Sequence, residues 1–91
     1  MVNNKIKTFT DLNAWKKSHE LVLFVYKITD LFPKKELFSL TNQMRRSAIS
    51  ITSNIAESFS RQSYKEKIRF YSIALGSLTE LQSQFLRSQR Y

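Results

Sequence analysis

The fold of this chain is decided by the stretch from Leu40 to Phe59, LTNQMRRSAISITSNIAESF. Its apolar side chains recur every three or four positions, at Leu40, Met44, Ala48, Ile51, Ile55 and Phe59. This spacing places them on one face of an α-helix, because an α-helix turns once in about 3.6 residues. The stretch therefore predicts an amphipathic helix over about residues 40–59, with the apolar face turned toward a core.

A second helix is predicted downstream, over about residues 64–90. Its start has the pattern of a capping box, in which Ser63 is the N-cap and Glu66 is the third helical residue. Its expected core face is formed by Tyr64, Ile68, Tyr71, Leu75, Leu78 and Phe85, with Ala74 and Leu81 beside it. Gly76 costs about 1 kcal/mol inside a helix, so we expect a neighbouring backbone to approach it closely.

A third helix is predicted upstream, over about residues 11–31, with Thr10 as its N-cap. Pro33 separates it from the following helix. It carries two adjacent apolar stripes, one of Leu12, Trp15, His19, Val22 and Tyr26, the other of Leu21, Val25, Ile28 and Phe32. A surface helix needs an apolar arc of only about 100°, and these stripes cover more than half of the circumference. We therefore expect this helix to pack against more than one neighbour.

The composition agrees with an all-α fold. The chain of 91 residues has one Gly and one Pro, whereas sheets and turn-rich folds need more of both. Short connections make neighbouring helices antiparallel, so we expect one domain over residues 1–91, built as an up-down antiparallel helix bundle. The bundle has either three helices or the pattern of a four-helix bundle, in which a further helix or a second copy covers the first helix.

No targeting or membrane-spanning segment is evident. The N-terminus, MVNNKIK, is polar, and the longest apolar run, from Leu21 to Tyr26, is far shorter than the ~20 residues that span a bilayer. The chain has no cysteine, so we expect neither disulfides nor thiolate metal sites. These features predict a cytoplasmic protein with no membrane association.

A polar stripe accompanies the apolar one on the helix of residues 40–59. Its members also recur at helical spacing: Gln43, Arg46, Ser50, Asn54 and Glu57. Two interpretations stay open. The stripe is either an ordinary solvated face or a hydrogen-bonded network at an interface between helices or subunits, because these residue types can bond to one another.

The stretch from Gln43 to Glu57, QMRRSAISITSNIAE, resembles the hallmark of the 23S rRNA intervening-sequence protein family. LNAWKKSHEL at residues 12–21 resembles the opening helix of that family, and RFYSIALGSLTEL at residues 69–81 resembles its third helix. Phe32-Pro33, followed by Glu36 and Leu40, resembles its first connection. The resemblance covers about residues 9–86.

This resemblance implies a four-helix bundle that assembles into ring-like homopentamers, with no enzymatic activity. Some members are encoded within intervening sequences of bacterial 23S rRNA genes, and a related group serves reverse transcriptases of diversity-generating retroelements and binds nucleic acid through a basic surface. The chain departs from the family in two ways. Ser58 stands where the family pattern has Gly, and the fourth helix of the family is absent from these 91 residues.

Catalysis has little support in the sequence. The only histidine, His19, lies on an apolar stripe and is expected to be a packed residue. No second His or Cys can complete a metal site, and there is no Gly-rich phosphate loop. Glu57 and Glu80 can pair across two helices, but bonds to Arg46 or Ser77 are their more usual use. We expect a protein without enzymatic activity, cofactor, metal or small-molecule substrate.

Nucleic-acid binding has more support. The chain carries 15 Lys and Arg against 7 Asp and Glu, a net charge of +8, which favours phosphate-rich partners. Arg61, Lys65 and Arg69 form a basic row at the start of the last helix, and Tyr64 beside them can stack on a base. Further candidates for contact with RNA or DNA are Lys67, Arg45, Lys16 and Lys17.

The rival interpretation is a structural or scaffold protein that binds another protein. Its basic charge would then be incidental. Partner choice would lie in exposed apolar residues of the first helix, such as Leu23, Phe24 and Leu31. Both interpretations include a homo-oligomer.

Overall fold

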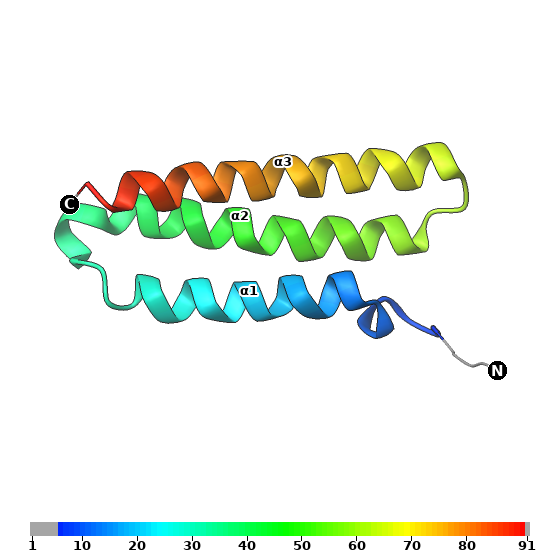
Figure 1. The fold of residues 1–91 in the computed structure, drawn as a ribbon, viewed down its shortest axis with the longest axis horizontal. Coiled ribbons are helices and arrows are strands. Elements are labelled where there is room, and N and C mark those ends of the chain that lie inside the picture. The colour runs from blue at the N-terminus through cyan, green and yellow to red at the C-terminus, as the bar shows by residue number, and fades with distance from the viewer. Residues whose placement is uncertain (1–5, 91) are drawn as a thin grey trace.

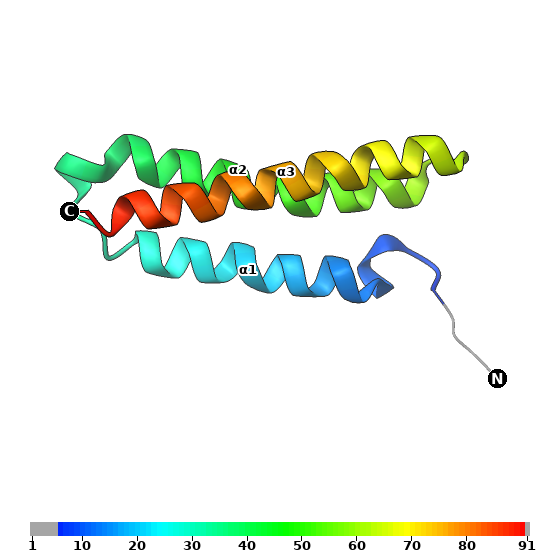
Figure 2. The same cartoon turned by 45° about the horizontal axis from the view of Figure 1, so that its top comes forward.

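The computed structural model describes residues 6–90 as three long α-helices that follow a short 3-10 turn. In chain order these elements are η1 (Phe9–Asp11), α1 (Asn13–Thr29), α2 (Lys34–Ser60) and α3 (Tyr64–Ser88). The described residues contain no strand. α2 runs antiparallel to α1 and to α3 (Figures 1 and 2). The predicted all-α, up-down architecture is therefore confirmed.

The three helices form a flat layer with α2 in the middle (Figure 1). α2 packs against both neighbours, whereas the backbones of α1 and α3 stay apart throughout residues 6–90. The molecule measures 50 × 25 × 15 Å along its principal axes. The start of α1, the end of α2 and the start of α3 lie at one end of the layer (Figure 1). Residues that are far apart in the sequence are thereby gathered at that end.

The chain enters α1 through a capped turn that lies earlier than predicted. Thr8, not Thr10, is the cap: its side chain accepts a hydrogen bond from the backbone of Thr10, and the carboxylate of Asp11 accepts one from the backbone of Thr8. This capping box closes η1, and the chain leaves helical geometry at Leu12. α1 therefore begins at Asn13 and ends at Thr29, inside the predicted range of 11–31.

α2 begins at Lys34, well before the expected start near Leu40. Pro33 has a fixed φ that suits the residue just before or at a helix start, and its carbonyl accepts a hydrogen bond from the backbone of Leu37 at 2.9 Å. Leu37 departs from helical geometry, with φ −114° and ψ 19°, so the first turn meets the main helix at a kink. The apolar pattern begins only after this kink, which explains why periodicity placed the start too late.

The predicted core face of α2 is confirmed over most of its length. Met44 and Ala48 are fully buried, and Leu40, Ile51 and Ile55 are at most 7% exposed, whereas Phe59 is only half-buried. Val25 from α1, Leu37, and Ala74 and Leu81 from α3 complete the core. Ser58 stays helical, with its hydroxyl donating to the carbonyl of Ile55 at 2.8 Å, and α2 continues to Ser60. No described residue needs the positive φ that the family's Gly would permit.

The predicted core face of α3 is wrong for this chain taken alone. Its large apolar residues Tyr64, Ile68, Tyr71, Leu75 and Phe85 are 41–78% exposed, and only Leu78 among the six is half-buried. The buried residues of α3 are instead Ala74, Ser77, Leu81, Gln84 and Ser88. Small side chains let α3 approach α2 closely, and this approach turns the apolar stripe of α3 away from α2.

The N-cap of α3 is confirmed, whereas the expected contact at Gly76 is absent. The Ser63 hydroxyl accepts a hydrogen bond from the backbone of Glu66 at 3.1 Å. A side chain built at Gly76 would meet no atom within 4 Å, so no neighbouring backbone of the described chain approaches it. The helix ends at Ser88, shortly before the predicted end near Arg90.

Candidate nucleic-acid interface

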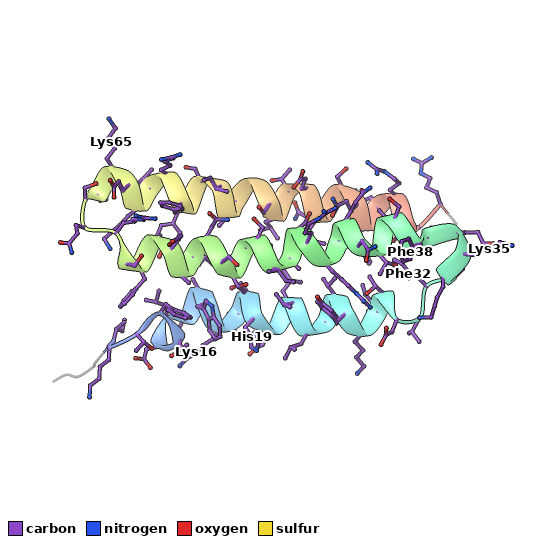
Figure 3. The ribbon with its side chains drawn as sticks, turned by 180° about the vertical axis from the view of Figure 1, so that it is seen from behind. Lys16, His19, Phe32, Lys35, Phe38 and Lys65 are labelled. Carbon is purple, nitrogen blue, oxygen red and sulfur yellow. The ribbon has the colours of Figure 1, made fainter. Side chains whose placement is uncertain are left out.

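Basic side chains gather where α1 begins, α2 ends and α3 begins. Lys65 on α3 and Lys16 on α1 lie at this end (Figure 3). Lys17, Arg69 and Tyr64 belong to the same turns of α1 and α3, and all five side chains are exposed. Antiparallel packing places the starts of α1 and α3 at the same end of the layer as the end of α2, with Lys65 and Lys16 at its opposite edges (Figure 3). We call Lys16, Lys17, Tyr64, Lys65 and Arg69 the basic end.

Two of the predicted phosphate-binding residues at this end already have partners within the chain. The Nζ of Lys67 donates to the carbonyls of Ser58 and Phe59, at 3.2 and 3.3 Å. These carbonyls belong to the last turn of α2, and that of Ser58 also accepts a hydrogen bond from the backbone of Arg61 at 3.3 Å. Lys67 therefore helps to cap that helix. Lys67 is therefore less available to a ligand than Lys65 or Arg69.

Arg61 is also held by the chain. Its Nη2 donates to Oε2 of Glu57 at 3.3 Å, and its guanidinium lies 4.8 Å from the centre of the Phe70 ring. Its Nε is buried and has no hydrogen-bond partner among the described residues. Arg69 lies 5.8 Å from the same ring, so the two arginines share Phe70 as a support. This support keeps the Arg69 charge at the surface in a restricted position.

Arg45 lies apart from the basic end, because it fastens the end of α1 to α2. Its Nε donates to the Thr29 hydroxyl at 2.9 Å and its Nη2 donates to Oδ1 of Asp30 at 3.1 Å. The guanidinium also lies 4.4 Å from the centre of the Tyr26 ring. These contacts use the side chain in the fold, so the structure does not bring Arg45 together with the other predicted contacts.

His19 is exposed and does not belong to the core, contrary to the sequence prediction. Its ring stacks on that of Trp15, with centres 4.9 Å apart and planes within 8°. Phe9 of η1 meets the Trp15 ring edge to face, at 5.5 Å. The helical stripe that contains His19 is wider than the surface that α2 covers, and His19 lies beyond the covered part. Tyr26, from the same stripe, is 39% exposed for the same reason.

The polar stripe of α2 lies along the seam with α3. The hydroxyls of Ser50 and Ser77 share a hydrogen bond of 2.8 Å across the two helices. Asn54 donates to the backbone carbonyl of Ser50 at 2.8 Å and to its hydroxyl at 3.1 Å. One bond of the predicted network, between Ser50 and Ser77, therefore joins α2 to α3, and Asn54 supports Ser50 from within α2. The purely solvated interpretation does not apply to these three residues.

The remaining members of the predicted network bond elsewhere or not at all. Gln43 donates to the hydroxyl of Ser39 at 3.2 Å, one turn away, and Glu57 pairs with Arg61. Arg46 and Glu80 are exposed and form no salt bridge in the part of the chain that the structure describes. Glu57 therefore pairs with Arg61 in place of Arg46, and the expected bond of Glu80 to Arg46 or Ser77 is not present among the described residues.

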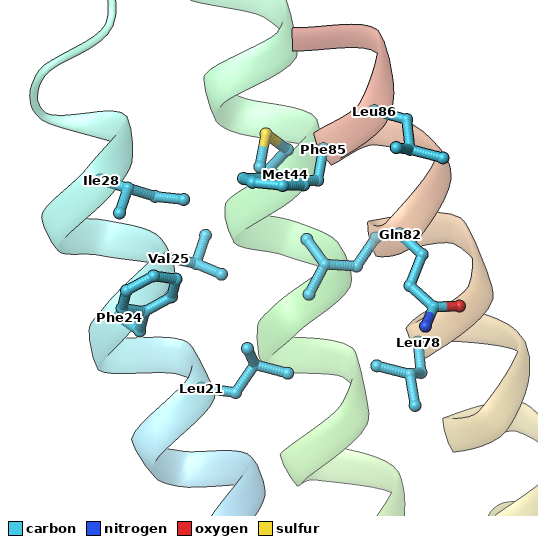
Figure 4. A pocket seen from close by; sticks show the side chains of 10 residues that line it. Leu21, Phe24, Val25, Ile28, Met44, Leu78, Gln82, Phe85 and Leu86 are labelled. Atoms are coloured by element: carbon cyan, nitrogen blue, oxygen red, sulfur yellow. The ribbon is translucent and has the colours of Figure 1, made fainter. Parts of the chain in front are cut away.

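An apolar groove runs between α1 and α3 above Met44 (Figure 4). Its volume is about 560 Å³. One wall is formed by α1, through Leu21, Phe24, Val25 and Ile28, and the other by α3, through Leu78, Leu81, Gln82, Phe85 and Leu86. The sequence patterns missed Leu86 and Gln82 as neighbours of α1, because a periodic stripe shows which residues share a face but not which helix they face. The groove accounts for the exposure of Phe85 and Leu86 on α3.

Two further features bear on function. Within residues 6–90, no helix combines the length and apolar character required to cross a bilayer. The same residues hold no cluster of three or more His, Asp or Glu that could bind a metal ion.

Comparison with known protein families places most of the chain in one of them. The family model described as 23S rRNA-intervening sequence protein matches residues 10–91. No curated protein matches the chain significantly.

Proposed function

Because the chain belongs to the 23S rRNA-intervening sequence protein family, we propose that it is a non-enzymatic, self-associating helical protein that binds RNA through its basic end. A bacterial cytoplasmic location, where ribosomal RNA resides, is part of this proposal. The observation that carries it is that Lys16, Lys17, Lys65, Arg69 and Tyr64 are all exposed and belong to the starts of α1 and α3, at one end of the molecule. The family name alone does not assign RNA binding to the protein.

The basic end fits phosphate contacts better than base recognition. Lys16, Lys17 and Lys65 are flexible point charges, and none lies in a groove or fork that would orient it toward a base edge. Arg69 is steadied on Phe70, and Tyr64 offers a ring that is 78% exposed for stacking on an unpaired base. We therefore expect steep salt dependence and weak sequence preference.

Self-association is supported by the apolar surface that the three helices leave uncovered. Leu23, Phe24 and Leu31 of α1 are 57%, 54% and 83% exposed, and the apolar groove separates α1 from α3. Phe24 also lines the groove, and exposed apolar surface of this kind favours an interface. A further helix of the protein or helices of sister copies would cover it, and the family resemblance favours a homopentamer.

The proposed function involves no reaction. His19 is held in a stack with Trp15, and the carboxylates of Asp11, Asp30 and Glu57 are used in caps or ion pairs. Binding therefore accounts for the surface chemistry without a catalytic step.

RNA binding is tested by comparing two double variants that remove the same charge from opposite ends. Lys65→Ala with Arg69→Ala alters the basic end, whereas Lys34→Ala with Lys35→Ala alters the first turn of α2 at the far end (Figure 3). Affinity for an RNA hairpin is measured by fluorescence anisotropy from about 50 to about 200 mM salt. We expect the first variant to bind RNA roughly tenfold or more weakly. We also expect the slope of the logarithm of its binding constant against the logarithm of the salt concentration to become shallower by about 1–2, because each lost phosphate contact lowers the magnitude of that slope by about 0.7–0.9.

The control variant is expected to keep its affinity within about threefold, since it loses only distant attraction that salt screens. Equal losses of RNA affinity in both variants would mean that net charge alone attracts RNA and that the basic end is not a specific RNA-binding site. Absence of binding by the unaltered protein at the lowest salt would reject the RNA role.

A scaffold that binds another protein is the second candidate. The exposed side chains of Leu23, Phe24 and Leu31 are the observation that favours it. It gains support if RNA binding is absent while Phe24→Ser, which leaves the core untouched, removes binding of a protein partner.

A further inference from the structure

A second, polar cleft lies between α2 and α3 and shares no residue with the apolar groove. It measures about 330 Å³ and is lined by Gln43, Arg46, Ser47, Ser50, Glu80 and Gln84. The basic end does not extend to it, and neither the RNA-binding proposal nor the fold uses Arg46 or Glu80. Three observations indicate that it receives something from outside the chain.

The first observation is a buried amide without a partner. Gln84 is only 8% exposed, its Oε1 is enclosed, and that atom accepts no hydrogen bond in the described chain. Buried polar groups are almost always bonded, and the enclosed Oε1 can meet a group from outside the chain only after the amide turns. A half-turn of the amide about its last torsion exchanges its oxygen and nitrogen. The cleft side of Gln84 can therefore present either a donor or an acceptor to an incoming group.

The second observation is a pair of opposite charges that do not meet. Arg46 on α2 and Glu80 on α3 line the same cleft, both are exposed, and neither takes part in a salt bridge among the described residues. The neighbouring Arg45, and Arg61 at the end of α2, by contrast, both have acidic partners. A surface that carries one unpaired cation and one unpaired anion is complementary to another copy of itself.

The third observation is Gly76, one helical turn before Glu80 on the same side of α3. It is exposed, and a side chain placed there would meet open space. Glycine weakens a helix interior, and nothing within the described chain requires it at this position. The absence of a side chain is useful if the backbone of another molecule lies close to α3 at this turn.

We propose that this face of α2 and α3 is the contact between copies of the chain, in which Arg46 of one copy pairs with Glu80 of the next beside Gln84, over the bare turn at Gly76. The inference rests on the self-association proposed above and gives it a location. The partner is a second copy because the cleft offers both members of the ion pair. In a closed assembly each copy then gives one charge and receives the other.

Charge reversal tests the pairing. Arg46→Glu and Glu80→Arg are each examined by native mass spectrometry and by light scattering, alone and as an equimolar mixture. Each variant alone places like charges across the contact, so we expect its assembly to dissociate at concentrations at least tenfold higher than for the unaltered protein. In the mixture, the charge introduced in one variant meets an opposite charge on the other variant, so complexes that contain both variants should reappear.

Matched controls are Lys35→Glu and Glu20→Arg, which make the same charge changes at exposed positions outside the cleft. Both should assemble as the unaltered protein does. Gly76→Leu adds a side chain for which the single chain has room. We therefore expect this variant protein to keep its helix content but no longer to form the multimer.

The possible outcomes separate three claims: the location of the contact, the pairing of Arg46 with Glu80, and self-association itself. If both charge variants or Gly76→Leu stay assembled, the contact is elsewhere and self-association stands. If the single variants dissociate but their mixture does not recover, the pairing of Arg46 with Glu80 is wrong. If the unaltered protein is a monomer at every concentration, this inference and the proposed self-association both fail.

Discussion

At the scale of single residues, Arg45 does more for the fold than its sequence context predicts. It lies within the Arg45-Arg46 pair, and the sequence offers no sign that the two differ. In the structure, Arg45 bonds to Thr29 and Asp30 at the end of α1 and lies over Tyr26, whereas Arg46 forms no ion pair with any described residue. Arg45 therefore joins two helices, whereas Arg46, the next residue, lines the polar cleft.

Arg45→Ala is expected to destabilise the protein by about 1–2 kcal/mol, because it removes charge-assisted bonds that are only partly exposed to solvent. Arg45→Lys should recover only part of this, since lysine lacks the planar fork that reaches Thr29 and Asp30 together. Lys35→Ala is the control, with an expected change within about 0.5 kcal/mol. Urea unfolding at one protein concentration measures all three, and equal stability of Arg45→Ala and Lys35→Ala would show that the contact is unimportant.

Asp11 gives a prediction about pH. The backbone N–H of Lys7 and then that of Thr8 donate to its carboxylate, and these bonds hold the pKa of Asp11 below its usual value. A carboxyl with a lowered pKa stabilises the folded state above its unfolded pKa of about 3.9, and loses this effect as the pH falls through the lower folded value. We expect η1 to open in that acidic range while α1 to α3 persist.

Amide hydrogen exchange at Lys7 and Thr8 follows this opening as the pH is lowered. Asp11→Asn should show fast exchange at these amides already at neutral pH. Protection that does not change with pH, or that survives in Asp11→Asn, would show that the carboxylate does not hold the turn.

At the scale of helices, periodicity predicted α2 well and α3 poorly, for a physical reason. α2 lies in the middle of the layer, so its apolar face is its buried face. α3 packs on α2 through Ala74, Ser77, Leu81, Gln84 and Ser88, and its apolar stripe borders the groove and the solvent. The spacing of these buried residues is also helical, but small and polar side chains carry no hydropathy signal. Gln84 was missed for that reason.

The seam between α2 and α3 can be tested with two equal substitutions on one helix. Ser77→Leu places a large side chain where Ser77 is 8% exposed and bonded to Ser50, and should cost about 2 kcal/mol or more. Ser72→Leu makes the same change on the exposed side of α3 and should stay within about 0.5 kcal/mol. Urea unfolding at one protein concentration compares them. Similar losses in both variants would contradict the observed orientation of α3.

The sequence predicted which basic residues belong to the candidate site, but not which of them share one end of the molecule. Charge and spacing selected Lys16, Lys17, Lys65 and Arg69, and antiparallel packing brings them to one end. The same reasoning selected Lys67 and Arg45, which the chain uses to cap α2 and to fasten α1. Whether a cation faces solvent or a carbonyl depends on tertiary contacts a few ångströms away, and residue spacing carries no information about these.

At the scale of the whole molecule, three helices in a layer 15 Å thick leave large apolar side chains of α1 and α3 exposed, which is why we propose that the chain assembles. α1 was expected to need more than one neighbour, and within residues 6–90 it packs on η1 and α2, with the groove on its other side. The flat shape and the groove both follow from α1 and α3 each packing on α2 and not on one another. The proposed assembly would strengthen the proposed RNA binding, because several basic ends on one particle would be able to bind one RNA together.

The molar mass in solution, measured by size-exclusion chromatography with light scattering over a range of concentrations, tests self-association most directly. A stable multimer is expected, with about 54 kDa for five copies of the 10.8 kDa chain. A mass near 10.8 kDa at every concentration would show that one chain tolerates its open groove in water, and would contradict the proposed assembly.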